Sequence, residues 1–313
     1  MIKLVYVIVG VSKSEYLNML RISLASARRY MPAIEIEIVT DEETGKALSA
    51  GDIPQKYNAR IVAVPIEGEY TTVERSRVLK TNLRELVSGD FLYLDTDTII
   101  CEDFSDYVPQ GSVNLVADAH CLLAEQEEQG EPIRRAARQR GLNLDACERY
   151  YNGGVVIAKD DAVAHEFFRK WHDTWKRTKQ PKMHHDQYSL NAVNMEMNAI
   201  CELDGTWNCQ LTANYRAFSY LRGVKILHYL SLQPEGIYRL NRDELMTSEL
   251  TDSQIEELLD RPEQHFLRFY FYAEDSVDNR IMLGSHYHLI RRIYTRRPKL
   301  YRFGEKFFSL FRK

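Results

Sequence analysis

The strongest constraint on the fold is an alternation of strand-like and helix-like segments over the first 94 residues. Residues 4–9 form a continuous apolar run, which is typical of a parallel strand covered on both faces. Residues 16–30 follow with apolar side chains at helical spacing. The alternation continues through further predicted strands and helices at residues 34–39, 44–49, 60–64, 73–86 and 91–94. This order predicts an α/β fold with an open, mostly parallel sheet flanked by helices.

Two aspartates follow the fourth predicted strand directly. The run FLYL at residues 91–94 ends in Asp95-Thr96-Asp97, and ligands in open α/β sheets bind outside the carboxyl ends of strands. Two neighbouring carboxylates repel each other, and a magnesium or manganese ion offsets that repulsion while leaving positions for phosphate oxygens and water. The pattern therefore predicts a metal site, although a polar strand end that forms only caps and turns has the same residues.

The same segment, DTDTI, also resembles the first motif of haloacid dehalogenase-type phosphatases, in which the first acid is a nucleophile. That motif has Gly after its second Asp and lies on the first strand, whereas here Thr98 follows and three predicted strands precede it. A phosphatase and a noncatalytic sugar-binding module remain as alternatives. A nucleotidyltransferase would need a Gly-rich loop with Arg after the first strand, which residues 9–13 do not provide.

Composition places the chain among ordinary globular proteins, since 44% of its 313 residues are hydrophobic and 27% are charged. Its length suits one large domain with additions. The five cysteines include no Cys-x-x-Cys pair, so neither a disulfide framework nor a structural zinc site is indicated, and a reducing cytoplasm fits best. Residues 2–11 are interpreted as a buried strand rather than a signal peptide, and no apolar run is long enough to span a bilayer.

Positive charge is concentrated in residues 286–313. Nine Lys and Arg and one Glu give this tail a net charge of +8, which leaves −12 for the rest of a chain whose total is −4. An acidic body argues against general nucleic-acid binding. Apolar residues at i, i+3, i+7 and i+11 predict an amphipathic helix in the tail, through Leu300, Phe303, Phe307 and Phe311. We predict that it binds an anionic membrane surface, with packing against the protein's own body as the alternative.

Five segments in order along the chain resemble the motifs of glycosyltransferase family 8 and its relatives, which include glycogenin and lipopolysaccharide sugar transferases. They are LYLDTDTII, YNGGVVIAK, HHDQYSLN, LDGTWN and KILHYLS. The resemblance implies a GT-A fold, a Rossmann-like and mostly parallel sheet flanked by helices, here with a C-terminal helical extension. The expected domains are a GT-A glycosyltransferase domain at residues 1–240, a peripheral helical extension at 241–285 and the basic aromatic tail at 286–313.

The resemblance also implies roles for particular residues. The metal ligands would be Asp95, Asp97 and His228, the last from a predicted strand at residues 225–229. The catalytic pair beside the reacting carbon of the donor sugar would be Asp186 and Gln187. Donor binding would involve Val9, Tyr16, Arg77, Lys80, Asp95, Thr96, Asp97, Asn152, Gly153 and Gly154, and Asp118 is a possible sugar-binding residue.

Some of these residues also have a simpler interpretation. Lys80 and Arg77 could be solvated, and Tyr16 could be a core residue of its helix. Asn152-Gly153-Gly154 is interpreted as a turn before a strand at residues 155–158, where glycine allows close backbone approach. The charged residues 124–149 are interpreted as exposed helix and loop, either a lid or a solvated insertion.

Two departures from the family concern nucleotide contacts. Lys13 stands where relatives often have an acid for the base, and the Gly and Lys-Pro-Trp segment that often follows the family histidine is missing after His228. With these exceptions, the resemblance implies a metal-dependent enzyme that moves a hexose from a UDP-sugar to a hydroxyl of a glycan. The acceptor would be a lipid-linked precursor of lipopolysaccharide or another surface polysaccharide at the inner face of the plasma membrane. Transfer would retain the anomeric configuration.

Overall fold

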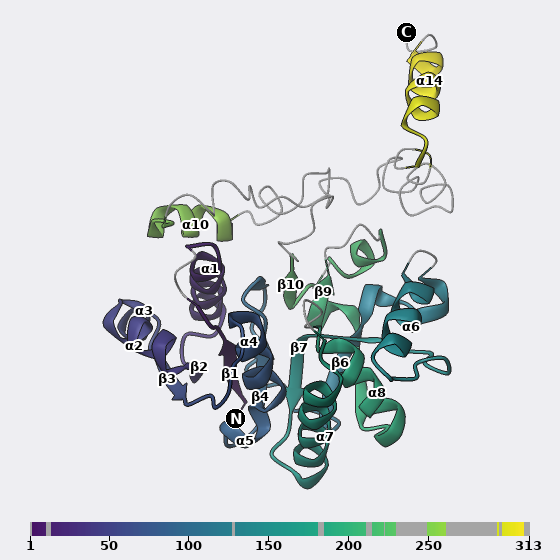
Figure 1. Cartoon of the computed structure of the whole chain (residues 1–313). Coiled ribbons are helices and arrows are strands. Elements are labelled where there is room, and N and C mark those ends of the chain that lie inside the picture. The colour runs from purple at the N-terminus through teal and green to yellow at the C-terminus, as the bar shows by residue number, and fades with distance from the viewer. Residues whose placement is uncertain are drawn as a thin grey trace. The chain divides into compact units, whose positions relative to one another are not determined.

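The computed structural model describes residues 2–10, 14–126, 129–180, 185–210, 215–221, 223–229, 249–260, 293 and 296–309. The chain divides into two units, residues 1–266 and 267–313. The first unit contains the central sheet and every labelled element up to helix α10 (Asp252–Asp260), and the second contains helix α14 (Pro298–Ser309) (Figure 1).

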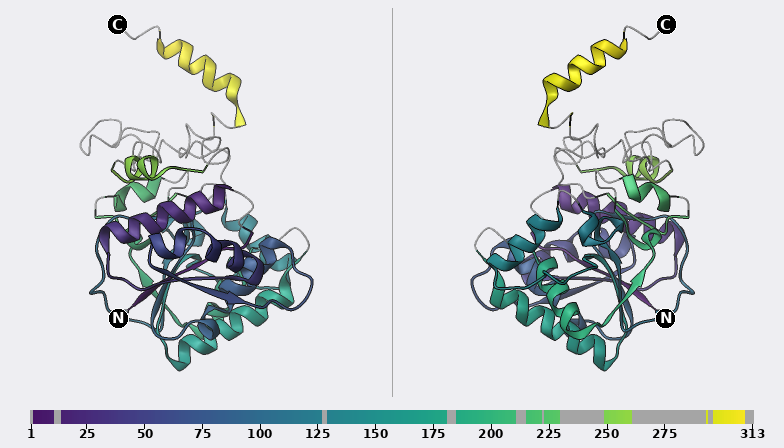
Figure 2. Two further views of the ribbon diagram at one scale, coloured as in Figure 1. Left: turned by 90° about the vertical axis from the view of Figure 1, so that its left-hand side faces the viewer. Right: turned by 90° about the vertical axis from the view of Figure 1, so that its right-hand side faces the viewer.

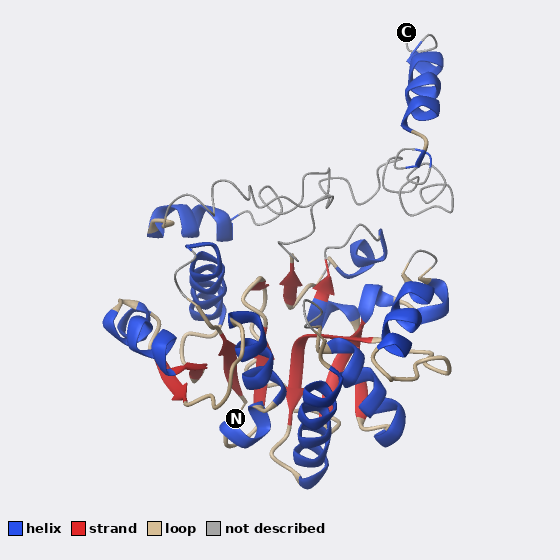
Figure 3. Ribbon diagram, viewed as in Figure 1, coloured by secondary structure: helices blue, strands red, loops and turns tan. Residues whose placement is uncertain are grey.

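Seven strands form the central sheet in the order β3-β2-β1-β4-β7-β6-β8 (Figure 3). They are β1 (Lys3–Val7), β2 (Ile36–Asp41), β3 (Ala59–Val64), β4 (Phe91–Leu94), β6 (Val113–Ala117), β7 (Tyr151–Ala158) and β8 (Ile200–Leu203). All neighbours pair in parallel except β7, which runs antiparallel to both β4 and β6. The predicted mostly parallel α/β sheet is confirmed.

Helices cover both faces of this sheet, and Figure 2 shows α1 and α7 on opposite sides of it. The helices of the first unit besides α10 are α1 (Ser14–Tyr30), α2 (Glu42–Ala50), α3 (Ile53–Lys56), α4 (Thr72–Thr81), α5 (Leu83–Leu86), α6 (Gly130–Gln139), α7 (Ala162–Thr178) and α8 (Gln187–Met197). Alternate residues of β1 point to the two faces. Leu4 and Tyr6 pack in the cluster that includes α1, and Val5 and Val7 pack in the cluster that includes α4, α7 and α8.

A second sheet of three short strands joins segments that lie far apart in the sequence. Its order is β5-β10-β9, with β5 (Thr98–Ile100), β10 (Ile226–His228) and β9 (Cys209–Gln210). Strand β5 follows β4 after the three residues 95–97, and β10 pairs with it in antiparallel register so that His228 lies opposite Thr98. The connections include four 3-10 helices, η1 (Asp118–His120), η2 (Leu123–Glu125), η3 (Gly205–Asn208) and η4 (Tyr215–Tyr220).

Two local predictions are corrected by the structure. The segment 152–154 is not a turn but belongs to the first half of β7, which is buried along its whole length. The predicted helix at residues 73–86 is divided into α4 and α5 at Asn82, a residue that is not helical. Asn is a poor helix former because its side chain competes for backbone hydrogen bonds.

The charged segment 124–149 is more than a solvated insertion. It carries α6, and its apolar residues form a small buried cluster with flanking side chains, made of Leu123, Ala137, Leu142, Leu144, Cys147 and Tyr150. Tyr188 and Ala192 of α8 pack against this cluster. Most of its charged side chains are exposed, and Arg138 pairs there with Glu131 and Asp145, whereas Arg140 is buried over the Tyr188 ring. The segment is therefore anchored to α8 by apolar contacts that its charge pattern conceals.

The predicted extension at residues 241–285 lies mostly outside the described residues. Its described part is α10, which packs on α1 through ion pairs of Arg29 with Glu256 and Asp260. The tail is helical over α14, as the spacing of its apolar residues predicts, while Phe311 lies outside the described residues. Within the described residues, no helix combines the length and the apolar character that crossing a membrane requires.

Candidate active site

The acidic loop 95–97 begins where β4 ends at Leu94, as predicted. Buried hydroxyl groups hold its backbone. Thr98 Oγ1 donates to the Asp95 carbonyl at 2.8 Å, and the same hydroxyl lies 3.1 Å from Ser23 Oγ, which lies 3.0 Å from the hydroxyl of Tyr6. This network ties the loop to α1 and β1, so the two aspartates extend from a rigid base.

Asp95, Asp97 and His228 come together as the sequence predicts. One ligand atom from each lies within 4.8 Å of the other two, and His228 Nε2 is 3.3 Å from Asp97 Oδ1. Among the described residues, this is the one group of three such side chains. Burial lowers the pKa of His228, but the Asp97 and Asp95 carboxylates outweigh that effect and raise it, so the environment favours positive charge. Two carboxylates and an imidazole are a ligand set that suits manganese or magnesium.

Gly154 is the residue that makes room for this group. A Cβ atom there would lie 2.3 Å from His228 Cε1 and 2.9 Å from Asp95 Oδ2, closer than real Cβ contacts. A glycine inside a strand often marks such a close approach. The glycine that was interpreted as part of a turn is therefore explained by side chains packing against the strand.

Two cations lie beside the acidic loop, Lys80 buried and Arg77 with 28% of its side chain exposed, and both pair with carboxylates. Lys80 is 3% exposed, and its Nζ lies 3.1 Å from Asp95 Oδ1 and 3.8 Å from Asp186 Oδ2. Arg77 Nε lies 3.2 Å from Asp186 Oδ1. Burial alone raises the pKa of Asp95, but Lys80, His228 and Arg77 outweigh it and lower the pKa to about 2. Asp95 is therefore a carboxylate at any physiological pH, as a metal ligand must be.

Asp186 and Gln187 stand at the start of α8. The Asp186 carbonyl accepts hydrogen bonds from Trp171 Nε1 at 3.1 Å and from Ser189 Oγ at 2.7 Å. These bonds fix Asp186 at the N-terminal end of α8. Its carboxylate is buried and turned toward Lys80 and Arg77. The predicted catalytic pair is thus connected to the acidic loop through shared cations.

The Gln187 side chain is hydrogen-bonded to the Asp118 carboxyl, which also accepts a bond from Asn152 Nδ2 at 3.0 Å. Burial raises the pKa of Asp118, and these two amide donors offset part of that rise. Gly153 lies beside Lys80, whose Nζ would be 3.8 Å from a Cβ at that position. Asp118, Asn152 and Gln187 therefore form a second polar group near the first.

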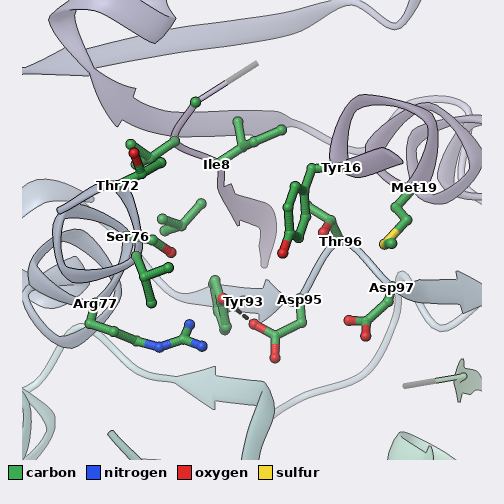
Figure 4. Close-up of a pocket in the computed structure, with 14 residues that line it drawn as sticks. Ile8, Tyr16, Met19, Thr72, Ser76, Arg77, Tyr93, Asp95, Thr96 and Asp97 are labelled. Atoms are coloured by element: carbon green, nitrogen blue, oxygen red, sulfur yellow. Dashed lines mark hydrogen bonds between the residues drawn. The ribbon is translucent and has the colours of Figure 1, made fainter. Parts of the chain in front are cut away.

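A cavity of about 300 Å³ opens beside the acidic loop, between α1, α4 and the end of β1 (Figure 4). Six predicted donor-binding residues line it, namely Val9, Tyr16, Arg77, Asp95, Thr96 and Asp97. The other predicted site residues do not line the cavity. They are Lys80, Asp118, Asn152, Gly153, Gly154, Asp186, Gln187 and His228.

Sequence reasoning missed several lining residues, among them Ile8, Gly10, Met19, Thr72, Val73, Ser76 and Tyr93. One signal could have found part of this wall. Thr71 and Glu74 form a capping box, the Thr-x-x-Glu signature of a helix start, so the N-terminus of α4 was readable. The Tyr93 hydroxyl donates to Asp95 Oδ1, a contact that the strand sequence alone does not reveal (Figure 4).

Solved structures with a similar fold define the fold class of this chain. The galactosyltransferase LgtC, solved with donor and acceptor sugar analogues, matches with a TM-score of 0.52 at 16% identity, over 83% of this chain and 95% of that chain. GlyE, a glycosyltransferase of Streptococcus pneumoniae, matches with a TM-score of 0.52 at 15% identity, over 85% of this chain and 65% of that chain. The fold is that of the GT-A glycosyltransferases.

The sequence places the chain more narrowly. The model of glycosyl transferase family 8 matches residues 8–233, and the chain belongs to this family. A search of curated proteins gives no significant match. The family decides between the functions that the sequence left open, because it makes the chain a glycosyltransferase rather than a phosphatase or a noncatalytic module.

Proposed function

We propose that this glycosyltransferase moves a hexose from a UDP-sugar to a hydroxyl of a glycan acceptor, with a divalent cation and with retention of anomeric configuration. The observation that carries the proposal is the cavity that Tyr16 and the acidic loop line together. An aromatic side chain suits a flat base, and the Asp95, Asp97 and His228 group suits a cation that binds the attached diphosphate.

A divalent cation bound at this site would supply Lewis-acid stabilisation of the charge on the departing diphosphate. Asp95, Asp97 and His228 hold it, and Lys80 and Arg77 keep the Asp186 carboxylate in place at the start of α8. Asp186 and Gln187 face the donor sugar, while Asn152 and Asp118 hydrogen-bond its hydroxyls. Retention follows from attack by the acceptor on the face from which the diphosphate departs, or from a covalent intermediate on a protein carboxylate.

The tail supports a membrane-held acceptor. Helix α14 exposes large apolar side chains, with Leu300 56%, Phe303 70% and Phe307 49% exposed. Lys299, Arg302 and Lys306 lie on the same helix, and each basic residue near an anionic surface is worth about 1 kcal/mol. We therefore propose that the enzyme works on a lipid-linked glycan, as in lipopolysaccharide or other surface polysaccharide synthesis, from the inner face of the plasma membrane.

Donor hydrolysis tests this function. Purified protein is incubated with UDP-glucose, UDP-galactose, UDP-N-acetylglucosamine and the corresponding GDP-sugars, with manganese, with magnesium or with a chelator. We expect UDP release from one UDP-sugar that requires the ion and is lost in Asp97→Asn. Asp106→Asn, which makes the same change at an exposed position away from the loop, serves as the matched control and should behave as the wild type. Nucleotide release with chelator present, or preference for GDP-sugars, would contradict the proposal.

A further inference from the structure

We propose that Asn208 is a positioning residue that fixes His228 in the tautomer a metal requires and connects it to the sugar-facing amide of Asn152. This inference rests on the proposed metal-dependent function. His228 Nδ1 lies 3.0 Å from Asn208 Oδ1, Asn208 Nδ2 lies 3.1 Å from Asn152 Oδ1, and Asn152 Nδ2 lies 3.0 Å from Asp118 Oδ1. Four side chains from β10, η3, β7 and η1 thus form one continuous chain of hydrogen bonds.

A backbone amide sets the direction of every bond in this chain. Gly154 N–H donates to Asn152 Oδ1 at 2.9 Å, and a peptide N–H can only donate. Asn152 Oδ1 is therefore an acceptor, and the atom of Asn208 that faces it must be the NH2 group. The Asn208 oxygen then faces His228, so His228 Nδ1 must carry a proton. Carboxylate acceptance at Asp118, at the other end, agrees with this direction.

This assignment leaves Nε2, the nitrogen that faces Asp97, as the atom that would bind a metal once it gives up its proton. A neutral imidazole protonated at Nδ1 presents an unprotonated Nε2, and Nε2 is the atom that lies 3.3 Å from Asp97. Histidines that bind metals commonly donate their second N–H to an acceptor, which orients the ring and raises the basicity of the ligand atom. Here the acceptor is the side-chain oxygen of Asn208.

Three of the four members of this chain of hydrogen bonds are buried, so they have few alternative partners. Asn208 is 0% exposed, His228 2% and Asn152 7%. A buried amide that loses its partner is left unsatisfied at a cost in free energy, which holds the observed arrangement against its alternatives. In addition, Gly154 contacts two members of this chain of hydrogen bonds. Its N–H orients Asn152, and its missing Cβ leaves space for the His228 ring.

Asn208 is presented by a rigid turn. Asp204 caps η3 by accepting from the Thr206 backbone N–H at 2.9 Å, and Trp207 packs on Phe104 and Tyr107 with ring centroids 5.0 and 4.3 Å apart. Trp207 and Asn208 belong to the segment LDGTWN, which resembles a family motif. The bond directions indicate a more specific task, in which Trp207 anchors the turn and Asn208 orients the ligand.

The test measures manganese affinity directly, by electron paramagnetic resonance of free Mn²⁺, and measures donor kinetics separately. Asn208→Leu keeps the volume and removes both hydrogen bonds, so we expect manganese binding to weaken by about 10- to 100-fold. Asn208→Asp keeps an acceptor for His228 but removes the donor to Asn152. We expect this variant to bind manganese about as well as the wild type while the KM for the donor sugar rises or kcat falls.

Asn114→Leu is the matched control. Asn114 is another wholly buried asparagine, but its amide bonds the backbone of Gly111 and Ile157 away from the site. We expect it to lower the melting temperature without changing manganese affinity. If Asn208→Leu does not fold, the separation of metal affinity from donor kinetics in Asn208→Asp carries the test.

Wild-type manganese affinity in Asn208→Leu would overturn the inference, and so would an Asn208→Asp variant that loses metal and donor binding together. Failure of the wild type itself to bind manganese would refute the metal centre of the proposed function, and this inference with it. The two failures are therefore distinguishable.

Discussion

Replacing Gly154 by alanine is the most incisive perturbation of the metal group, because one methyl group is added where the His228 and Asp95 side chains converge. The new Cβ would lie 2.3 Å from His228 Cε1, and ordinary van der Waals contact begins at 3.4 Å. The His228 ring, or the strand, would have to move by about 1 Å. Both are buried, and Asn208 holds the ring at Nδ1, so neither can move freely.

The magnitude follows from the packing. Adding a methyl group to a well-packed interior typically costs about 1–3 kcal/mol. If that strain falls on the ligand arrangement, it weakens manganese binding by about 5- to 150-fold, since 1.4 kcal/mol is a factor of ten. Turnover should fall further, because displacement of a reacting group by about 1 Å can cost a factor of about 100. The variant should nevertheless fold, because the change is local to β7.

The adjacent glycine provides the comparison. At Gly153 a Cβ would meet Leu190 Cδ1 at 3.5 Å and Lys80 Nζ at 3.8 Å, which are ordinary contacts. When manganese affinity is measured by electron paramagnetic resonance of free Mn²⁺, Gly153→Ala should therefore bind the ion within about twofold of the wild type, whereas Gly154→Ala should not. The reasoning is refuted if Gly154→Ala binds manganese as the wild type does, or if both variants lose affinity equally, since a shared loss would indicate damage to the strand rather than a clash with His228.

Three further changes test other parts of the molecule. Hydrogen bonds that His165 donates to Asp160 and Glu85 raise its pKa, so the stability it adds is present below about pH 6.5 and is lost as the pH rises through the folded pKa. In urea unfolding, His165→Gln should cost under about 1 kcal/mol at pH 5.5 and less at pH 8.5, and an equal cost at both would contradict this. Lys80→Met removes the buried cation that Asp95 and Asp186 share and should destabilise the fold by about 3 kcal/mol, the lower end for a broken buried pair because Arg77 still pairs with Asp186, and an unchanged melting temperature would refute this. Changing both Phe303 and Phe307 to serine should reduce binding to phosphatidylglycerol vesicles by more than about 100-fold in co-sedimentation, and retained binding would exclude α14 as the anchor.

The sheet was predictable because the sequence pattern within each segment indicates whether it forms a strand or a helix. Apolar runs bounded by polar residues gave every strand of the parallel half, and β4 was placed at residues 91–94 without error. The acidic loop was equally predictable, since Asp95 and Asp97 follow that strand directly. Local pattern was sufficient wherever the physical cause of a structure lies within a few residues of sequence.

The local pattern failed where the cause is distant. Asn152 and Gly154 suggest a turn when only their sequence neighbours are considered, yet they lie in a buried strand. There Asn208 donates a hydrogen bond to the Asn152 side-chain oxygen, and the His228 ring lies where a Cβ of residue 154 would be. From the sequence, Lys80 could have been a solvated helix residue. It is instead buried with Asp95 and Asp186 as its ion-pair partners, and Asp186 is more than a hundred positions away. Pairings of this kind cannot be inferred from periodicity.

The register of two very short strands decides whether the metal group exists. β10 has three residues, and its pairing with β5 sets His228 opposite Thr98, while Tyr229 N–H donates to the Asp97 carbonyl at 3.1 Å. Because side chains alternate across a strand, a shift of one residue would turn His228 to the other face. Three hydrophobic residues resist that shift, as Ile226, Ile100 and Ile99 are buried in the observed register. The position of the histidine is thus enforced by core packing around it as well as by its own polar partners, so apolar substitutions in β5 or β10 are expected to act on metal binding through strand register.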